Sequence, residues 1–203
     1  MENIIYVVDD DASIRESLSF LFSTLQWSTQ CFDAIDAFSA ACKPESMLTG
    51  CLLLDMRMPG QSGLAWIEKH SASHPLLPVV MMTGHGSIDA CRRAFHHGVF
   101  EFFTKPLDAD LLIETVHLAF AESEKRQRGW REHTRAKALF ALLTARETDV
   151  LHELMTGASN KEVAVRLALS TRTVEAHRAA IFSKLGVSSL VQAIREHDKL
   201  DYV

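Results

Sequence analysis

The sequence has no apolar run approaching the roughly 20 residues that a membrane-spanning helix needs. Its first residues, MENIIYVVDDD, contain no basic segment followed by an apolar one, so we expect no secretory signal peptide. Cysteine is scarce and shows no CxxC spacing, which argues against a disulfide or zinc framework. These absences predict a globular cytoplasmic protein with reduced thiols and no membrane partner.

Positive charge is scarce in the first part of the chain and more abundant in the second. Residues 1–120 carry 7 Lys or Arg against 15 Asp or Glu, whereas residues 121–203 carry 14 against 11. An acidic half joined to a mildly basic half is typical of two domains that meet different partners. We therefore expect an acidic N-terminal domain, residues 1–120, followed by a separate C-terminal region.

Strand and helix patterns alternate through residues 1–120. Five short runs have the composition of strands, and helical patterns follow them. Helices are expected after Ser13, which would form a capping box with Glu16, and after a cap at Asp33. This order predicts an α/β domain, a five-stranded parallel and doubly wound sheet with helices on both faces. The expected strands are residues 4–8, 28–32, 51–55, 78–82 and 100–103.

The remainder of the chain has only helical patterns. Residues 121–142 are rich in charge and in helix formers, so we expect a helical linker, with an interruption allowed at Gly129. Residues 143–203 contain two capping boxes, Thr144 with Glu147 and Ser159 with Glu162. They predict a small all-α domain of four helices, near residues 145–156, 160–168, 171–185 and 188–197.

Polar residues follow four of the five expected strands. Asp9 and Asp10 end the first strand, Asp55 the third, Thr83 the fourth and Lys105 the fifth. Ligands of open parallel sheets bind beyond the carboxyl ends of the strands, so we expect these side chains to lie close together. Taken alone, Asp55 would be interpreted as a turn former or a helix cap. Its neighbours at the sheet edge favour a functional role.

The residue types at this edge suit phosphoryl transfer. Oxygen ligands from Asp10 and Asp55, completed by water, suit Mg²⁺, which would also neutralise an incoming phosphoryl group. A carboxylate such as that of Asp55 can attack phosphorus and form an acyl phosphate. Lys105 offers a positive charge, and Thr83 offers a hydroxyl donor for phosphoryl oxygens. The sequence therefore predicts an aspartate that accepts phosphate.

Four motifs carry a family resemblance. VVDDD, LLLDMRMPG, MMTGHG and FFTKP, in this order and spacing, resemble the receiver domain of two-component response regulators, which has a flavodoxin-like (CheY-like) fold. The resemblance implies that a partner sensor histidine kinase phosphorylates Asp55. It also implies that Mg²⁺ is bound directly by Asp10 and Asp55, mainly through water by Asp9, and by the backbone carbonyl of Arg57.

The same resemblance assigns a switch. It implies that Thr83, Gly84 and Lys105 contact the phosphoryl group, and that Phe102 is the switch aromatic that turns inward on phosphorylation. The residues alone leave a plain core role for Phe102 equally open. The Lys105–Pro106 peptide is expected to be cis, which proline permits at low cost. In the family, this switch leads to a homodimer.

A C-terminal segment, SNKEVAVRLALSTRTVEAHRAAIFSKLGV, predicts two helices joined by a tight turn at residues 168–170. The second helix, residues 171–185, has one apolar stripe, and small and charged residues remain on the opposite face. Such a face can enter the major groove of DNA. These features alone leave a protein-binding helical bundle equally open. Four cations are candidates for phosphate contacts: Lys161, Arg172, Arg178 and Lys184.

Residues 143–197 resemble the LuxR-type helix-turn-helix of NarL/FixJ response regulators, and the chain is nearest the FixJ branch. The TVEAH…KLGV core carries most of this resemblance, which makes residues 171–185 the recognition helix. Glu175, Ala176 and Ala179 are then expected at base edges. Thr173 is expected at the DNA backbone together with the four cations.

The expected function is that of a transcription factor, not an enzyme, which phosphorylation of Asp55 switches on. The phosphorylated chain is expected to dimerise on roughly palindromic promoter DNA, with RNA polymerase as a further candidate partner. Two alternatives stay open. One is an aspartate-nucleophile phosphatase of the haloacid dehalogenase type, although such enzymes carry the nucleophile in a DxD motif on the first strand. The other is a receiver that controls a protein- or RNA-binding module.

Overall fold

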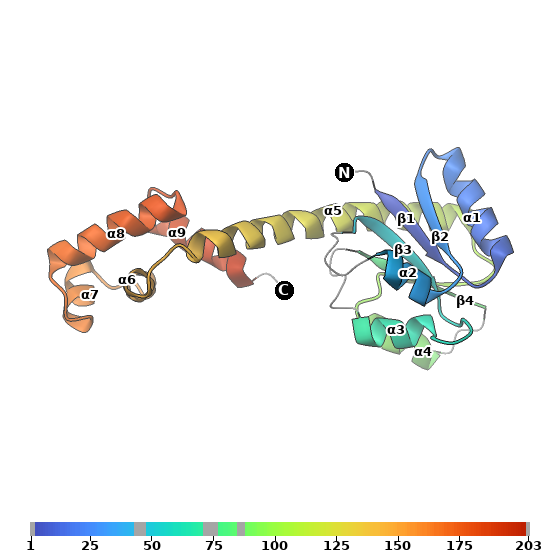
Figure 1. The fold of residues 1–203 in the computed structure, drawn as a ribbon, viewed down its shortest axis with the longest axis horizontal. Coiled ribbons are helices and arrows are strands. Elements are labelled where there is room, and N and C mark those ends of the chain that lie inside the picture. Colours follow the sequence, from blue (N-terminus) through green and yellow to red (C-terminus); the bar gives the residue numbers. More distant parts are fainter. Residues whose placement is uncertain (1–2, 43–47, 71–76, 85–87, 202–203) are drawn as a thin grey trace. The chain divides into compact units, whose positions relative to one another are not determined.

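The computed structural model describes residues 3–42, 48–70, 77–84 and 88–201 (Figure 1). Backbone contacts divide the chain into two compact units, Met1–Gln127 and Arg128–Val203, which we call unit 1 and unit 2. Within the described ranges, no helix combines the length and the apolar character that a membrane crossing requires. His85 of the MMTGHG motif lies outside the described residues.

Unit 1 is built on a parallel sheet of five strands in the order β2-β1-β3-β4-β5. The order confirms the predicted doubly wound, flavodoxin-like fold. All six residues of β3 and all five of β4 are buried, as expected for strands that helices cover on both faces. The strands are β1 (Ile4–Val8), β2 (Ser28–Phe32), β3 (Gly50–Asp55), β4 (Val79–Thr83) and β5 (Glu101–Thr104).

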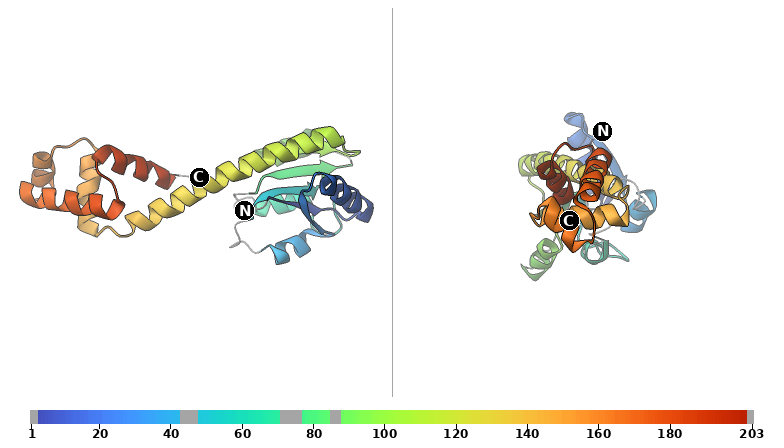
Figure 2. Two further views of the ribbon diagram at one scale, coloured as in Figure 1. Left: turned by 90° about the horizontal axis from the view of Figure 1, so that it is seen from above. Right: turned by 90° about the vertical axis from the view of Figure 1, so that its left-hand side faces the viewer.

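Helices cover both faces of this sheet, as Figure 2 shows from two further directions. One face packs against α1 (Ala12–Thr24) and the first part of α5 (Ala109–Phe140), through buried residues such as Phe22 and Leu112. The other face packs against the remaining three helices of unit 1. These are α2 (Ile35–Ala41), α3 (Gly63–His70) and α4 (Ile88–His96).

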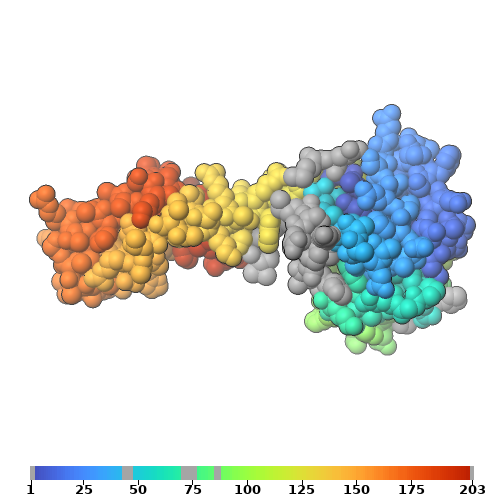
Figure 3. Space-filling model, in the orientation of Figure 1, coloured from blue at the N-terminus to red at the C-terminus, as the bar shows by residue number. Residues whose placement is uncertain are grey.

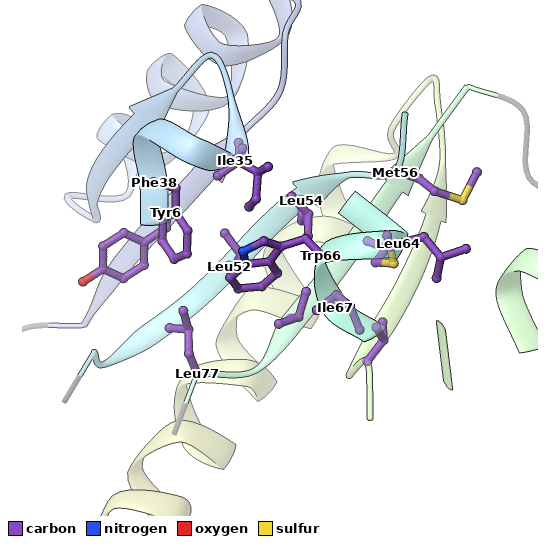
Figure 4. Packing of buried hydrophobic residues seen from close by; sticks show 14 of the residues in the cluster. Tyr6, Ile35, Phe38, Leu52, Leu54, Met56, Leu64, Trp66, Ile67 and Leu77 are labelled. Carbon is purple, nitrogen blue, oxygen red and sulfur yellow. The ribbon is translucent and has the colours of Figure 1, made fainter. Parts of the chain in front are cut away.

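Three buried aromatic residues, Tyr6, Phe38 and Trp66, pack among aliphatic side chains in the second of these layers (Figure 4). Trp66 of α3 meets Phe38 of α2 edge to face, with 5.8 Å between the ring centroids. The indole Nε1 of Trp66 donates a hydrogen bond to Ser39 Oγ at 3.0 Å, so its polar atom is satisfied although the ring is buried. This layer fixes α2 and α3 against the buried strand β3.

Two predicted helix caps are wrong. Asp11, not Ser13, caps α1, because the helix begins at Ala12 and the Asp11 carboxylate accepts a hydrogen bond from Ser13 N at 2.8 Å. The N-cap of α2 is Ala34, whose side chain can form no cap hydrogen bond, so Asp33 lies one residue too early to act as the cap. In both places the pattern located the helix but not its first turn.

Helix α5 runs without a break from Ala109 to Phe140, so the interruption allowed at Gly129 does not occur. A single glycine costs a helix only about 1 kcal/mol, which a helix of 32 residues can tolerate. The division between the two units falls inside this helix, after Gln127. The final turns of α5 belong to unit 2, where Ala136 is fully buried.

Unit 2 contains the four predicted helices together with the end of α5. Both predicted capping boxes are present, and Ser170 caps the third helix. Gly186 ends that helix in the left-handed conformation, with φ of 67°. The helices are α6 (Ala145–Met155), α7 (Asn160–Arg166), α8 (Thr171–Leu185) and α9 (Leu190–Asp198).

Gly50, at the start of β3, allows β1 and β3 to approach closely. Its φ is +111°, and a Cβ placed on it would lie 1.9 Å from the carbonyl oxygen of Ile4 in β1. Any side chain here must therefore push two central strands apart. Gly60 offers a matched comparison, because its φ is also positive, at +81°, but a Cβ there would meet nothing within 4 Å.

We predict that Gly50→Ala destabilises unit 1 by roughly 3–5 kcal/mol, since backbone strain and steric overlap add. Gly60→Ala should cost only about 1–2 kcal/mol, the penalty of the left-handed backbone alone. Urea unfolding of the full chain measures both. Equal losses in the two variants would contradict the close approach at Gly50.

Candidate functional site

An ion-paired cluster lies at the carboxyl edge of the sheet. Asp9 follows β1, Asp55 ends β3 and Lys105 follows β5. The Lys105 Nζ atom lies 2.6 Å from Asp9 Oδ2 and 2.7 Å from Asp55 Oδ1. Asp9 is fully buried and Asp55 is 4% exposed. The sheet thus holds two buried carboxylates against one shared ammonium group.

Backbone and side-chain donors fix the two carboxylates further. The backbone N–H of Arg57 donates to Asp55 Oδ2 at 2.6 Å, and that of Asp11 donates to Asp9 Oδ1 at 3.0 Å. Arg15 of α1 also contributes, since its Nη1 donates to the backbone carbonyl of Asp9 at 2.6 Å. These bonds fix the turn after β1 and the end of β3, so both carboxylates are pre-positioned.

Burial and neighbouring charges shift the pKa values of Asp55 and Lys105. Burial raises the pKa of Asp55 above its usual value, although hydrogen bonding to Lys105 and to the N–H of Arg57 opposes the rise. The Asp9 carboxylate adds to the increase, because a second negative charge nearby disfavours ionisation. For Lys105, burial lowers the pKa, but bonds to Asp55 and Asp9 outweigh it and raise the pKa overall. Lys105 therefore stays protonated and compensates the buried carboxylates.

The other residues predicted for this edge lie around the cluster. Thr83 is fully buried at the end of β4, the strand between β3 and β5. Asp10, which follows Asp9 after β1, is exposed, and so is Gly84, which follows Thr83 after β4. Phe102 on β5 is half-buried and packs against the core layer of α2, α3 and α4. The Lys105–Pro106 peptide is cis, as predicted.

The carboxylate oxygens at this edge of the sheet suit a hard cation that keeps most of its water ligands. Within the described ranges, no three His, Cys, Asp or Glu side chains converge as a ready-made metal cage. Mg²⁺ usually takes one or two carboxylates and keeps several waters, so a complete cage is not required. The exposed carboxylate of Asp10 and the carboxylate of Asp55 offer oxygens of the right kind.

Sequence reasoning missed two features of this region. Arg15 lies in the half-buried part of α1, and helical periodicity gives no sign that it reaches the carbonyl of Asp9. An apolar hollow of about 420 Å³ also lies between α1 and the segment that follows Lys105. Phe20 of α1 lines it and is 74% exposed, whereas Pro106 and Leu107 line the other side. Phe20 is apolar but lies off the buried stripe of α1, and this was the signal in the sequence that could have indicated the hollow.

In unit 2, helix α8 separates its buried and exposed residues as expected. Val174, Ile181 and Leu185 are buried in the core of the unit. The predicted base-edge residues are exposed on α8, and so is Arg172; Lys161 is exposed on α7. The base-edge residues are Glu175, Ala176 and Ala179.

Two other predicted DNA-contacting residues of α8 have partners within unit 2. Arg178 is half-exposed and its guanidinium lies 5.2 Å from the centre of the Phe182 ring. The hydroxyl of Thr173 lies 2.8 Å from that of Ser170, at the cap of α8.

Lys184 already has a partner inside unit 2. Its Nζ donates to Glu147 Oε2 at 2.6 Å, and Glu147 is buried at the start of α6. Hydrogen bonds from Lys184 and Thr144 lower the pKa of Glu147 to about 2, so this pair is ionised at any physiological pH. Lys184 therefore ties the end of α8 to α6, and a contact with DNA phosphate would have to compete with Glu147.

Comparisons with known families match both units. A model of the response regulator receiver domain matches residues 5–117, which is more than half of the chain. A model of the luxR family of bacterial regulatory proteins matches residues 141–197.

Individual relatives match almost the whole chain. The transcriptional regulatory protein FixJ of Bradyrhizobium diazoefficiens is 34% identical, over 94% of this chain and 92% of its own. The response regulator protein TmoT of Ectopseudomonas mendocina is 33% identical, over 98% of this chain and 90% of its own.

Two solved structures also match over almost the whole chain. The low-resolution structure of response regulator StyR has a TM-score of 0.82 and 34% identity, covering 98% of this chain and 100% of that one. Full-length FixJ from B. japonicum has a TM-score of 0.59 and 32% identity, covering 100% and 99%. The chain therefore belongs to the NarL/FixJ-type response regulators, in which a receiver domain is joined to a DNA-binding domain of the LuxR family.

Proposed function

We propose that Asp55 accepts a phosphoryl group from a partner sensor histidine kinase, and that phosphorylation promotes homodimerisation and binding to promoter DNA. The observation that carries this proposal is the setting of Asp55. Its carboxylate ends a central strand in an almost fully buried position, yet it is held by Lys105 and by the N–H of Arg57. Such a group is pre-positioned, and a positive charge stands beside it for the incoming phosphoryl group.

The transfer itself needs little beyond this arrangement. An oxygen of Asp55 attacks phosphorus and forms the new O–P bond, while the P–N bond to the kinase histidine breaks and its electron pair returns to the imidazole nitrogen. Lys105, which is shared between Asp9 and Asp55 before transfer, then donates to a phosphoryl oxygen. We assign the Thr83 hydroxyl and the backbone N–H of Gly84 to the other phosphoryl oxygens.

Receivers of this family generally bind Mg²⁺ in their acidic pocket, and the donors of this chain fit the ion. We assign it to Asp9, Asp10, Asp55 and the backbone carbonyl of Arg57. Asp10 forms no hydrogen bond or ion pair within the described residues, so its oxygens are available. When bound, Mg²⁺ supplies positive charge that offsets the repulsion between carboxylates and phosphoryl oxygens.

We assign the switch to Thr83 and Phe102. A phosphoryl group on Asp55 would attract the hydroxyl at the end of β4, the strand that pairs with β5 and places Met81 opposite Phe102. Phe102 is only half-buried, so the core does not fully enclose its ring. A local charge change would then select one of two arrangements of β5.

The surface for the homodimer is assigned to the region next to this strand. The exposed large apolar residues on α4 and the first part of α5 are Ile88, Phe95, Leu111 and Leu118. A dimer would bring two α8 helices to half-sites about one helical turn apart on promoter DNA. RNA polymerase is the further partner proposed for the bound dimer, and the cytoplasm is the proposed location.

A phosphatase of the dehalogenase type is disfavoured by the position of Asp55. The nucleophile would have to lie on the first strand with a second carboxylate two residues later, whereas Asp55 ends β3 and Arg57 stands two residues after it. The family consists of transcriptional response regulators. We therefore propose that the chain is not an enzyme, apart from slow loss of its own phosphate.

Incubation with Mg²⁺ and acetyl phosphate should give one phosphoryl adduct on the wild-type chain, and none on Asp55→Asn. Intact-mass spectrometry measures the adduct. Asp36→Asn, which alters an exposed carboxylate on α2, is the matched control and should be labelled normally. An adduct that persists in Asp55→Asn would overturn the assignment, and rapid turnover with steady release of phosphate would support a phosphatase instead.

The apolar hollow beside Lys105 is a suitable place for the phosphodonor protein to dock. It is lined by Phe20 and Leu21 of α1 and by Pro106, directly after the lysine of the acidic cluster. A hollow of this size, with an exposed aromatic residue at its side, is typical of an anchor site in a protein interface. A small phosphodonor would need no such contact.

Phe20→Ala should therefore slow phosphoryl transfer from a histidine kinase that labels the wild-type chain by roughly 30-fold, the effect of losing an anchor worth about 2 kcal/mol. Labelling by acetyl phosphate should be unchanged. Radiolabel transfer measures both rates. Val191→Ala, which shortens an exposed apolar residue on α9, is the control and should leave both rates intact. Equal slowing with both donors would place Phe20 in the receiver core instead.

The DNA assignment separates two kinds of residue on unit 2. Glu175→Ala should cost about 1–3 kcal/mol at one base position and relax the preference there, because a base-edge contact carries sequence information. Lys161→Gln should weaken binding to all sequences alike, because it contacts phosphate. Selection from a pool of random duplexes, followed by titration, measures the two effects. An unchanged selected sequence for both Glu175→Ala and Ala179→Glu would rule out α8 as the recognition helix.

A further inference from the structure

Three arginines form a row along the part of α5 that belongs to unit 2. They are Arg128, Arg131 and Arg135, and we call them the α5 stripe. All three are exposed. The segment that carries them is coloured yellow in Figure 3, and it is open to solvent on the side of the molecule shown there. Their spacing of three and four residues places them on one side of the helix. None of the residues proposed above to contact DNA lies on α5.

Two of the three arginines, Arg128 and Arg135, carry charge that no neighbouring side chain compensates within the described residues. Earlier on α5, Lys125 and Arg126 both form ion pairs with Glu122. In the described part of the chain, by contrast, the side chains of Arg128 and Arg135 form no ion pair or hydrogen bond. Residues 128–137 carry four Arg or Lys and a single Glu. The stripe is therefore a surface of excess positive charge.

The arrangement does not serve the helix itself. Like charges three or four residues apart on one face repel each other and destabilise the helix. The residues that bind this part of α5 to unit 2 lie elsewhere: Ala136 is buried, and Leu139 and Phe140 pack against the core cluster of the unit. Neither packing nor helix stability therefore explains the exposed charges of Arg128 and Arg135, whereas an external anion would relieve the repulsion along the stripe.

The dimensions of the stripe suit the phosphates of one DNA strand. Arg128 and Arg135 are seven residues apart, or roughly 10 Å along a helix that rises 1.5 Å per residue. Phosphates of one strand follow each other every 3.4 Å or so along the duplex axis, so the stripe spans about three of them. The stripe also lies in the same compact unit as the helix-turn-helix.

We propose that the α5 stripe is a second DNA contact, which binds backbone phosphates independently of sequence while α8 reads the bases. This proposal rests on the proposed function, since the occupant is the same DNA. It extends the binding surface beyond the helix-turn-helix to the helix that connects the two units. The strength of DNA binding would then depend on α5 as well as on unit 2's short helices.

The salt dependence of binding to a random-sequence duplex of 40 base pairs tests the proposal in the full-length chain. Each phosphate contact contributes about 0.9 to the slope of log K against log salt. The variant Arg128→Gln/Arg131→Gln/Arg135→Gln should reduce the magnitude of this slope by about 2–3. The corresponding triple Arg→Lys variant keeps three charges and should keep the wild-type slope. Helix content by circular dichroism should match in all variants, because Gln and Lys favour helix almost as well as Arg.

Two single substitutions calibrate the measurement. Lys69→Gln removes an exposed cation from α3 of unit 1 and should leave the slope unchanged, whereas Lys161→Gln should lower it by about 1. A wild-type slope in the triple Gln variant would overturn the proposal and would indicate that the stripe faces another acidic surface, such as unit 1 of a second copy. If the wild-type chain binds no duplex at any salt concentration, the proposed function fails as well, so the two failures are distinguishable.

Discussion

The shared ammonium of Lys105 is the interaction on which the rest of the receiver depends. Two carboxylates buried side by side repel each other and lose their hydration, and each effect alone would favour protonation. Lys105 offsets part of these costs with one group, although it lies 96 residues from Asp9 in the sequence. Only a fold that aligns the ends of β1, β3 and β5 can hold the three groups together, and the doubly wound sheet provides that alignment. The same arrangement makes Asp55 sensitive to any new negative charge, because the charge of Lys105 has then to be shared among more partners.

Helix α5 serves both units, and it does so by burying different sides along its length. Val116 and Ser123 are buried in unit 1, whereas Ala136 is buried in unit 2. The arginines of the α5 stripe are exposed, so they lie off the sides of the helix that these residues bury. The composition of the stripe is therefore free of the packing constraints that determine the residues on the buried sides.

Much of the architecture could be predicted from the sequence, because strand and helix periodicity are local signals. The five strands lie within one residue of their expected limits, and the capping boxes of α6 and α7 are present. The sequence also predicted that Asp9, Asp55 and Lys105 lie close together, since parallel strands end at a common edge of the sheet. The features that sequence reasoning missed depend on long-range contacts. Lys184 looked like a free cation because its partner, Glu147, lies 37 residues away, and the hollow near Phe20 needs two helices and a loop to form.

The hydrogen bond between Gly50 and Ser123 has a consequence for how receivers are exchanged among proteins. The backbone N–H of Gly50, at the buried start of β3, donates to Ser123 Oγ on α5 at 3.2 Å. A gene fusion joined at residue 120 would lose this acceptor and leave a buried donor unsatisfied in the central sheet, at a cost of about 1–3 kcal/mol. Recombination that keeps the helix through Gln127 would retain it. Workable junctions with other output domains therefore lie within the linker helix, beyond the point at which the family resemblance ends.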